Sequence, residues 1–338
     1  MNRKGLMIVA ELSANHNQNK QVAIDTLIAA KEAGADAVKL QTYTPDTMTI
    51  DCDKECFQIG GGTLWDGKTL YNLYREAYTP WEWHRELFDL ASSLDMLCFS
   101  TPFDKTAVDF LEQLGNPIYK IASFEITDIP LIRYVARLMK PVVISSGIAT
   151  LSELEVAIKA CREEGNNDIT LLKCTSAYPA SLDEANLLTL PVLKERFNVK
   201  VGLSDHTLGD IAALTATALG AELIEKHFIL DRSMGGADAA FSMEPAGFKT
   251  MVSRVREVET ALGSGRYELS EGSLKGRKFS RSLFVVEDIK KGETFNELNI
   301  RSIRPGDGMA PARIDEVSGK KACRDISRGT PLSEDMIC

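Results

Sequence analysis

The sequence is poor in histidine, has no excess of positive charge and contains no long apolar segment. Its 338 residues carry a formal net charge of -9, so the basic surface typical of nucleic-acid binding is absent. No apolar run approaches the roughly 18 residues that span a membrane. The run in MNRKGLMIVAEL is too short for a signal peptide and stops at Glu11. We therefore expect no targeting segment, and neither nucleic acid nor membrane as a partner.

The seven cysteines are odd in number and scattered along the chain. Cys98 and Cys174 lie inside apolar, strand-like runs, where reduced cysteine acts as a small hydrophobic residue. Cys52 and Cys56 are spaced like a metal-binding pair, but no second pair accompanies them, and two loop cysteines are the favoured interpretation. The cysteine pattern predicts a reduced, cytoplasmic protein.

Short β-rich runs alternate with helix-patterned segments along most of the chain. This alternation predicts parallel strands joined by helices, and eight such units predict a (β/α)8 TIM barrel. A doubly wound open sheet is the alternative, although no GxGxxG motif follows the first strand. The predicted strands are residues 6–12, 37–42, 96–101, 118–123, 141–146, 169–175, 199–205 and 223–228. The predicted helices are residues 20–33, 82–94, 104–114, 129–139, 151–164, 183–196, 209–219 and 245–262.

Two stretches depart from this alternation. Residues 43–81 separate the second strand from its helix, and a loop of that length is usually functional. Its glycines and aromatic residues favour a lid over a ligand, with a surface excursion as the alternative. Residues 263–281 are Gly/Ser-rich and charged, as linkers are. The chain is thus predicted to consist of a barrel domain (1–262), a linker (263–281) and a small, turn-rich β domain (282–338).

Every predicted strand ends in polar residues, at the end of the barrel where active sites lie. Because side chains two apart share a face of a strand, Lys39 and Gln41 belong together, as do Glu225 and His227. A lysine facing the interior is costly unless it has a partner. Lys39 and Lys120 form a cationic, hydroxyl-rich patch that suits a phosphate or carboxylate. The hydroxyl groups of this patch belong to Thr101, Ser123, Ser145 and Ser204.

Two of the four histidines, His206 and His227, close the seventh and eighth predicted strands. These strands are neighbours in a barrel, so the two imidazoles can share one divalent metal ion. Glu225, Asp205 or water would complete the coordination. Nitrogen and oxygen ligands suit Mn²⁺, Zn²⁺ or Co²⁺ and tolerate Mg²⁺ less well.

Eight motifs follow one another along the chain: AELSANHNQ (10–18), AVKLQT (37–42), FSTPFD (99–104), YKIAS (119–123), SSGIAT (145–150), KCTSAYP (173–179), VGLSDHT (201–207) and EKHFILDR (225–232). Taken together they resemble the nonulosonic (sialic) acid synthase family, and the resemblance covers essentially the whole chain. The segment from SRSLFVVEDIKKGE through SIRPGDGM is similar to the antifreeze-like (SAF) domain that ends those enzymes. Family members condense phosphoenolpyruvate with a 2-acetamido sugar and release phosphate.

Within the family, GGTLWDGKTLYNLYREAYTPWEWH and KCTSAYP are most similar to the pseudaminic acid synthases. Those enzymes use 2,4-diacetamido-2,4,6-trideoxy-L-altrose. Ser176 stands where N-acetylneuraminate synthases usually carry asparagine, which argues against N-acetylmannosamine as the substrate. An N-acetylneuraminate or legionaminic acid synthase is the alternative.

The resemblance also implies roles for individual residues. His206 and His227 would bind the divalent metal, Mn²⁺ first and Co²⁺ or Mg²⁺ next. Arg304 of the SAF domain would reach the sugar's acetamido group in a second subunit, which implies a domain-swapped homodimer. The residues implied at the reacting atoms are Glu11, Tyr178, Glu225 and Asp238. The residues implied in substrate binding are Lys39, Gln41, Thr101, Lys120, Ser123, Ser145, Ser176 and Ser204.

Two other functions compete with this interpretation. In a pyruvate-dependent lyase, Lys120 or Lys173 would form a Schiff base and the two histidines would have no role. In a sugar- or ice-binding protein, the C-terminal domain would act and the crowded mouth of the barrel would have no explanation.

Overall fold

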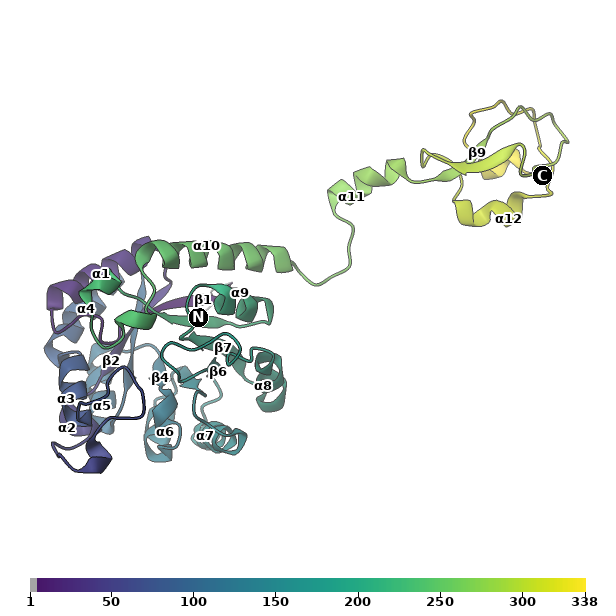
Figure 1. Ribbon diagram of the computed structural model, residues 1–338. Helices are drawn as coiled ribbons and strands as arrows, with labels where there is room; N and C mark the ends of the chain where they lie inside the picture. The colour runs from purple at the N-terminus through teal and green to yellow at the C-terminus, as the bar shows by residue number, and fades with distance from the viewer. Residues whose placement is uncertain (1–4) are drawn as a thin grey trace. The chain divides into compact units, whose positions relative to one another are not determined.

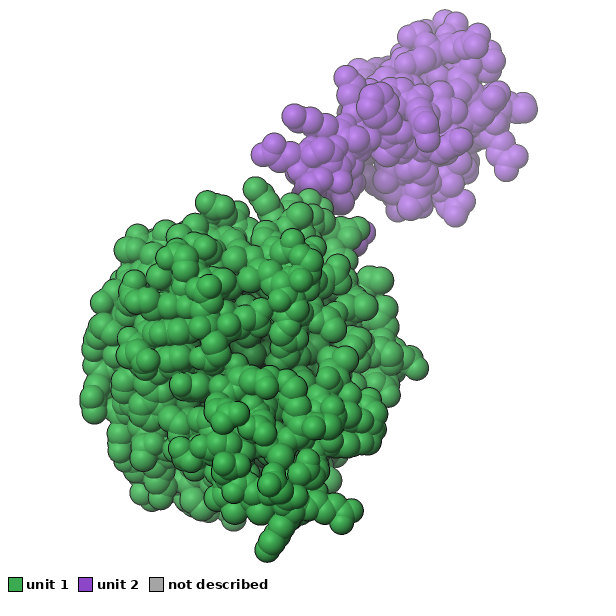
Figure 2. All heavy atoms as spheres, turned by 60° about the vertical axis from the view of Figure 1, so that its left-hand side comes forward, with its two compact units in different colours: residues 1–263 green, residues 264–338 purple. Residues whose placement is uncertain are grey.

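The computed structural model describes residues 5–338. Residues 1–4, the start of the stretch in which we expected no targeting segment, lie outside the described residues. The chain divides into two compact units, the first ending at Gly263 and the second running from Ser264 to Cys338 (Figure 2). No helix within residues 5–338 is long and apolar enough to cross a membrane.

The first unit is built on a closed barrel of eight parallel strands in the order β1 to β8, surrounded by helices (Figure 1). This closure confirms the predicted (β/α)8 barrel and excludes the open sheet. Each strand lies within a few residues of its predicted position, because the apolar runs bounded by turn residues mark strands well. The strands are β1 Met7–Glu11, β2 Ala37–Thr42, β3 Leu97–Pro102, β4 Tyr119–Ile121, β5 Val142–Ser145, β6 Ile169–Cys174, β7 Lys200–Asp205 and β8 Leu223–His227.

The helices that follow the strands match the predicted segments, with one difference. Helix α8 begins at Thr189, whereas the sequence pattern predicted a start at residue 183. Pro191 explains the shift, since a proline is tolerated in the first turn of a helix but breaks a helix interior. The helices are α1 Lys20–Glu32, α4 Trp81–Ser93, α5 Lys105–Leu114, α6 Ile129–Ala136, α7 Leu151–Glu163, α8 Thr189–Phe197, α9 Ile211–Ala218 and α10 Pro245–Leu262.

The long segment between β2 and α4 is partly helical. It contains α2 (Pro45–Met48), a 3-10 turn at Glu55–Phe57 and α3 (Leu70–Ala77). The Thr69 side chain caps α3 by accepting from the Asn72 backbone N–H at 3.2 Å. The segment is therefore an ordered excursion with its own helices.

The interior of the barrel is layered. Strand alternation places an apolar layer deep inside, and the next inward-facing residues, two positions later, are mostly polar or charged. Gly202 belongs to the deep layer, where a Cβ atom would lie 2.4 Å from the Leu223 carbonyl oxygen and 2.6 Å from Leu172 Cδ2, so only glycine fits. The other members of the apolar layer are Val9, Ala37, Phe99, Ile118, Val143, Leu172 and Leu223.

The second unit has its own small apolar core, which includes Leu283, Val285, Phe295 and Ile300. Strands β9 (Ser282–Val285) and β10 (Ile300–Ile303) pair antiparallel, and a short helix α12 (Ile314–Val317) follows them. The segment expected as a linker includes the short helix α11 (Glu271–Gly276).

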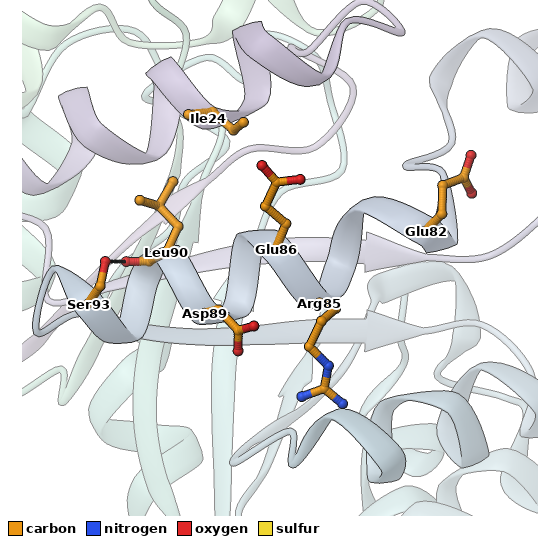
Figure 3. Close-up of a pocket in the computed structure, with 7 residues that line it drawn as sticks. All are labelled: Ile24, Glu82, Arg85, Glu86, Asp89, Leu90 and Ser93. Atoms are coloured by element: carbon orange, nitrogen blue, oxygen red, sulfur yellow. Dashed lines mark hydrogen bonds between the residues drawn. The ribbon is translucent and has the colours of Figure 1, made fainter.

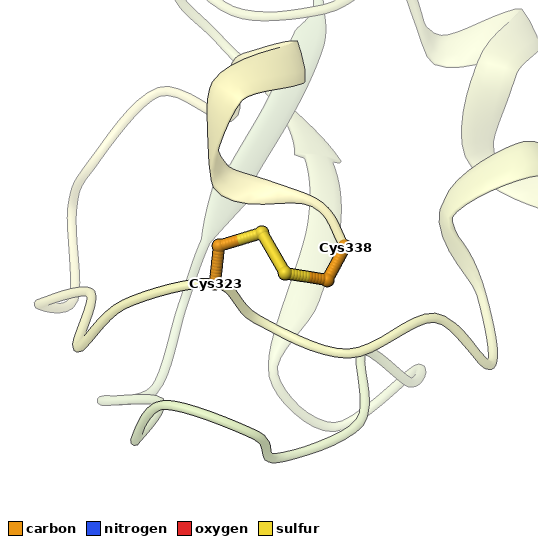
Figure 4. The surroundings of a disulfide bond; sticks show 2 residues. All are labelled: Cys323 and Cys338. Atoms are coloured by element: carbon orange, nitrogen blue, oxygen red, sulfur yellow. A yellow bond between two sulfur atoms is a disulfide. The ribbon is translucent and has the colours of Figure 1, made fainter.

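One cysteine pair departs from the expectation of a reduced chain. Cys323 and Cys338 form a disulfide that ties the C-terminal residue back to the second unit (Figure 4). Their Cα atoms are 5.3 Å apart, within the range that a disulfide spans. The prediction of fully reduced cysteines is therefore wrong for this pair, because the tertiary fold brings together two residues that look scattered in the sequence.

Candidate active site

A cavity of about 560 Å³ opens at the carboxyl ends of the barrel strands. Seven of the eight strands, all except β3, contribute side chains to it, together with the segment between β2 and α4 and the loop after β8. This is the end at which (β/α)8 enzymes place their chemistry. The cavity is thus the candidate active site.

A second hollow lies on the outside of the barrel, between α1 and α4 (Figure 3). It is lined by exposed α4 side chains such as Glu82, Arg85 and Glu86, and Glu86 pairs with Lys20 at 2.6 Å. No strand end contributes to its lining. Its surface ion pair is worth little energetically, and we assign no function to this hollow.

The floor of the cavity is a buried network of opposite charges. Lys39 Nζ lies 2.5 Å from Glu11 Oε2 and 3.8 Å from Glu225 Oε1, and it donates to Thr101 Oγ1 at 3.2 Å. Lys120 Nζ lies 3.4 Å from Glu225 Oε1, which also accepts from Ser204 Oγ at 3.0 Å. Buried charges persist only when paired, and these pairs satisfy that condition.

The pKa values of the two carboxyl groups in this network are shifted in opposite directions. Burial raises the pKa of Glu11 to about 7, against the lowering effect of Lys39. Burial also acts on Glu225, but Lys120 and Lys39 outweigh it and lower the pKa of that carboxyl. Burial lowers the pKa of Lys120. Pairs of groups whose pKa values are pushed apart are typical of acid–base sites.

Several buried polar atoms at the cavity have no hydrogen-bond partner within residues 5–338. They include Ser145 Oγ, Glu225 Oε2 and His227 Nδ1. Buried polar groups nearly always find a partner, so these atoms are placed to bind a ligand. Ser123 and Ser176 pack closely against Gly147 and leave no room for a side chain there. A Cβ atom on Gly147 would lie 2.0 Å from Ser176 Oγ and 2.6 Å from Ser123 Oγ.

The two histidines lie together at the mouth, with ring centres 5.3 Å apart. His206 Nδ1 is 2.9 Å from the Thr175 carbonyl oxygen, which only accepts, so Nδ1 carries a proton and Nε2 is the nitrogen left for a metal ion. Burial and the neighbouring His206 lower the pKa of His227 well below its usual value, which keeps that imidazole neutral.

This pair fits a divalent metal ion. Both rings offer an open nitrogen, and metal–imidazole bonds of about 2.1 Å are compatible with the separation of the rings. The hydrogen bond from His206 to Thr175 is the kind that orients a ligating imidazole. Within residues 5–338, no group of three or more His, Cys, Asp or Glu side chains is placed to hold a metal, so solvent or substrate would supply the remaining ligands.

Asp205 does not join the histidines, contrary to one of our expectations. Its carboxylate lies 2.6 Å from Lys226 Nζ, and both side chains are fully buried outside the cavity lining. The reason is strand alternation, because Asp205 lies between the inward-facing Ser204 and His206. Glu225, the other expected third ligand, is engaged by Ser204 and the two lysines.

An aromatic and acidic rim surrounds the histidines. The Tyr178 ring is 4.4 Å from that of His206 and 5.7 Å from that of Trp65. Trp65 Nε1 donates to the Ala237 carbonyl oxygen at 3.0 Å, joining the β2–α4 segment to the loop after β8. Asp238 Oδ2 lies 3.9 Å from His227 Nδ1. The rim thus places a hydroxyl and a carboxylate beside the two histidines.

The β2–α4 segment supplies most of the apolar lining of the cavity. Tyr74 of this segment and Glu125 of the turn after β4 also line it, and burial raises the pKa of Glu125 to about 7. The segment therefore lines the cavity, and its role as a lid stays a prediction. The apolar side chains that it contributes are Met48, Ile59, Leu70, Leu73 and Ala77, joined by Phe103 after β3.

Most of the site residues expected from the sequence line this one cavity. Thr101 and Ser176 lie just behind its surface, and Arg304 is an exposed residue of the second unit. Lys173 is off the cavity, where its Nζ donates to the Cys174 carbonyl at 2.9 Å. Sequence reasoning missed Ser13, Tyr43, Glu125 and Cys174. Their only signal is a position at or just after a strand end.

The fold and the site define a (β/α)8 enzyme with two buried lysines and several hydroxyl groups at its strand ends and two histidines beside them. The chain belongs to the NeuB family, whose model matches residues 26–267, and a SAF domain model matches residues 280–337.

Individual relatives agree with this assignment. The chain is 52% identical to a pseudaminic acid synthase of Helicobacter pylori, over 98% of this chain and 97% of that protein. It is 38% identical to an N,N'-diacetyllegionaminic acid synthase of Legionella pneumophila, over 96% of this chain and 92% of that protein. A crystal structure of N-acetylneuraminic acid synthetase from Leptospira borgpetersenii superposes with a TM-score of 0.72 at 30% identity, covering 81% of this chain and 90% of that one.

Proposed function

We propose that the protein is a pseudaminic acid synthase. It condenses phosphoenolpyruvate with 2,4-diacetamido-2,4,6-trideoxy-L-altrose and water, and it releases pseudaminic acid and phosphate with cleavage of the C–O bond of phosphoenolpyruvate. One observation carries the proposal. A single cavity joins two buried lysines, unsatisfied polar atoms and two histidines with open nitrogens. The 52% identity to the Helicobacter pylori enzyme supports the choice of sugar.

The floor of the cavity suits phosphoenolpyruvate. Lys39 and Lys120 supply two positive charges, and Ser145 and Ser204 supply hydroxyl donors. Fixed charges and donors of this kind stabilise a departing phosphate dianion. In this role the lysines act as charges, so no Schiff base is required. The carboxylates of Glu11 and Glu225, which lie beside these lysines, would stabilise positive charge at the enol carbon, where water adds.

His206 and His227 would hold the divalent metal, with Mn²⁺ the first choice and Co²⁺ or Mg²⁺ as alternatives. A bound metal would polarise the sugar aldehyde as a Lewis acid. Tyr178 and Asp238 flank the two histidines and would orient the sugar and the attacking water. Ser176 lies behind Gly147 and would shape the wall beside them.

The apolar side of the cavity supports a deoxy sugar. The proposed substrate has a methyl group at C6 and two acetamido methyl groups, which suit the side chains of Leu70, Leu73 and Ile59. A 6-hydroxyl group would lose its water against that wall without gaining a partner. We expect a preference of roughly tenfold to a hundredfold for the 6-deoxy sugar over its 6-hydroxy analogue.

The test is a substrate panel. Purified protein, phosphoenolpyruvate and Mn²⁺ are mixed with 2,4-diacetamido-2,4,6-trideoxy-L-altrose, its 6-hydroxy analogue, the legionaminic acid precursor or N-acetylmannosamine, and phosphate release is measured. The highest kcat/KM is expected with the first sugar. His227→Ala should abolish release with every sugar. A highest kcat/KM with N-acetylmannosamine would instead assign a neuraminate synthase.

We further propose a domain-swapped homodimer in which Arg304 serves the partner's barrel. Arg304 is exposed and makes no hydrogen bond or ion pair within residues 5–338. A guanidinium group can donate two parallel hydrogen bonds to a planar amide or carboxyl group. In a mixture of Arg304→Ala and His206→Ala subunits, exchange should restore activity, because one site of each heterodimer keeps both residues. No recovery in proven heterodimers would contradict the swap.

We place the reaction in the cytoplasm, where phosphoenolpyruvate is made.

A further inference from the structure

A buried ion pair lies directly behind the two histidines, and the proposed chemistry does not use it. Asp205 immediately precedes His206, and Lys226 immediately precedes His227. The two residues are register partners on β7 and β8. Their side chains are 0% and 1% exposed. Both point away from the cavity, between the strands and the surrounding helices, since the flanking Ser204 and His206 line it.

The pair fixes the backbone on both sides of His206. Lys226 Nζ donates to Asp205 Oδ2 at 2.6 Å and to the Thr207 carbonyl oxygen at 2.6 Å. Asp205 Oδ1 accepts from the Thr207 backbone N–H at 2.9 Å and from its hydroxyl at 2.8 Å. The residue before His227 is thereby tied to the residues before and after His206.

Stability alone does not account for such a pair. Removing two charges from water is costly, and apolar residues of similar volume often stabilise a protein equally well or better. What the pair adds is a fixed geometry between the ends of two strands. Ligand-orienting partners of this sort typically change metal affinity by tenfold to a hundredfold when they are replaced.

We propose that Asp205 and Lys226 are positioning residues that set the separation and orientation of His206 and His227 for one divalent metal ion. The proposal rests on the metal assignment made under the proposed function. Neither residue touches the substrate or the ion. Their effect passes through the Thr207 turn and the adjoining strand ends.

The test compares two double variants. Asp205→Asn/Lys226→Met removes the pair without leaving a lone buried charge, so the barrel should stay folded by circular dichroism. Asp168→Asn/Lys200→Met removes the exposed pair, 2.8 Å apart, at the other end of β7, and serves as the matched control. Mn²⁺ affinity of the metal-free full-length protein is measured by electron paramagnetic resonance, with melting temperature and phosphoenolpyruvate affinity alongside.

We expect Asp205→Asn/Lys226→Met to bind Mn²⁺ at least tenfold more weakly, with unchanged melting temperature and phosphoenolpyruvate affinity, while the control matches the parent. Thr207→Val keeps both charges and removes only the hydroxyl that donates to Asp205 Oδ1; it should also weaken Mn²⁺ binding, which keeps a test available if the double variant does not fold. Mn²⁺ affinity within tenfold of the parent in a folded variant overturns the positioning role. A parent protein that binds no Mn²⁺ overturns the metal assignment itself, a different result.

Discussion

The barrel interior has two layers, an apolar lower layer and a charged floor of the cavity above it. The same strands supply both layers, from residues that are two positions apart. On β8, Leu223 belongs to the apolar layer and Glu225 to the charged floor. On β2, Ala37 and Lys39 divide in the same way. The lower layer gains free energy by leaving water, whereas the charged floor gives up hydration to hold its groups in place. A step of two residues along a strand therefore separates the residues that stabilise the barrel from those proposed to take part in the reaction.

The largest expected effect comes from removing a charge of the upper layer. Lys120→Met should lower kcat/KM for phosphoenolpyruvate by roughly 10³-fold, because a fixed charge facing the phosphate is lost, and it should change sugar binding much less. Steady-state kinetics with each substrate varied will measure both effects.

The matched control is Lys173→Met, which removes a lysine of the neighbouring barrel region that lies off the cavity. Its kinetics should stay close to those of the parent. If pyruvate and borohydride trap Lys120 or Lys173 as an amine adduct, the lyase interpretation replaces the synthase.

Truncating a side chain of the lower, apolar layer should reduce stability and leave activity nearly unchanged. Phe99 is fully buried in the apolar layer, and Phe99→Ala should lower the free energy of unfolding by about 3–5 kcal/mol. Protein that remains folded should keep kcat within about threefold, because the floor residues stay in place. Denaturant unfolding and assays at low temperature test the separation of the two layers. Lost activity at unchanged stability would show that they are not separable.

The smallest expected effect is a pH dependence from Glu11. Its folded-state pKa is about 7, raised from 4.5 by burial, so the folded protein holds this proton more tightly than the unfolded chain. The free energy of unfolding should therefore fall as pH rises from about 4.5 to about 7, by up to about 3 kcal/mol.

The free energy of unfolding of the parent and of Glu11→Gln is measured at several pH values across this range. The variant should lose the part of the pH dependence that comes from Glu11. Glu225, whose pKa is lowered, contributes below this range. Glu125, whose pKa burial also raises to about 7, contributes within it in both proteins and cancels in the comparison. Equal slopes in the two proteins would contradict an ionisation of Glu11 in this window.

The strand ends could be predicted because alternation in a strand is a strict geometric rule. Lys39 with Gln41 and Glu225 with His227 were assigned to one face on that basis, and the structure places all four at the cavity. The same rule excludes Asp205 as a metal ligand, since it lies one residue from His206. Asp205 therefore pairs with Lys226 outside the cavity lining, contrary to the expectation that it could join the histidines.

Other features depend on contacts between distant parts of the chain. The Trp65–Ala237 hydrogen bond joins residues 172 positions apart, and nothing local indicates it. Glu125 reaches the cavity only through the turn after β4. The Cys323–Cys338 pair likewise depends on the fold of the second unit.

The position of Trp65 gives the molecule a built-in optical reporter. The chain has three tryptophans, and Trp81 and Trp83 belong to α4, where they pack against Phe110 and His16. Trp65 is the one that lines the cavity. Replacing the two α4 tryptophans with phenylalanine would leave a single tryptophan, at the mouth, which can be excited selectively near its red edge. Its emission would follow the entry and departure of unlabelled compounds in real time, before any bond is made or broken.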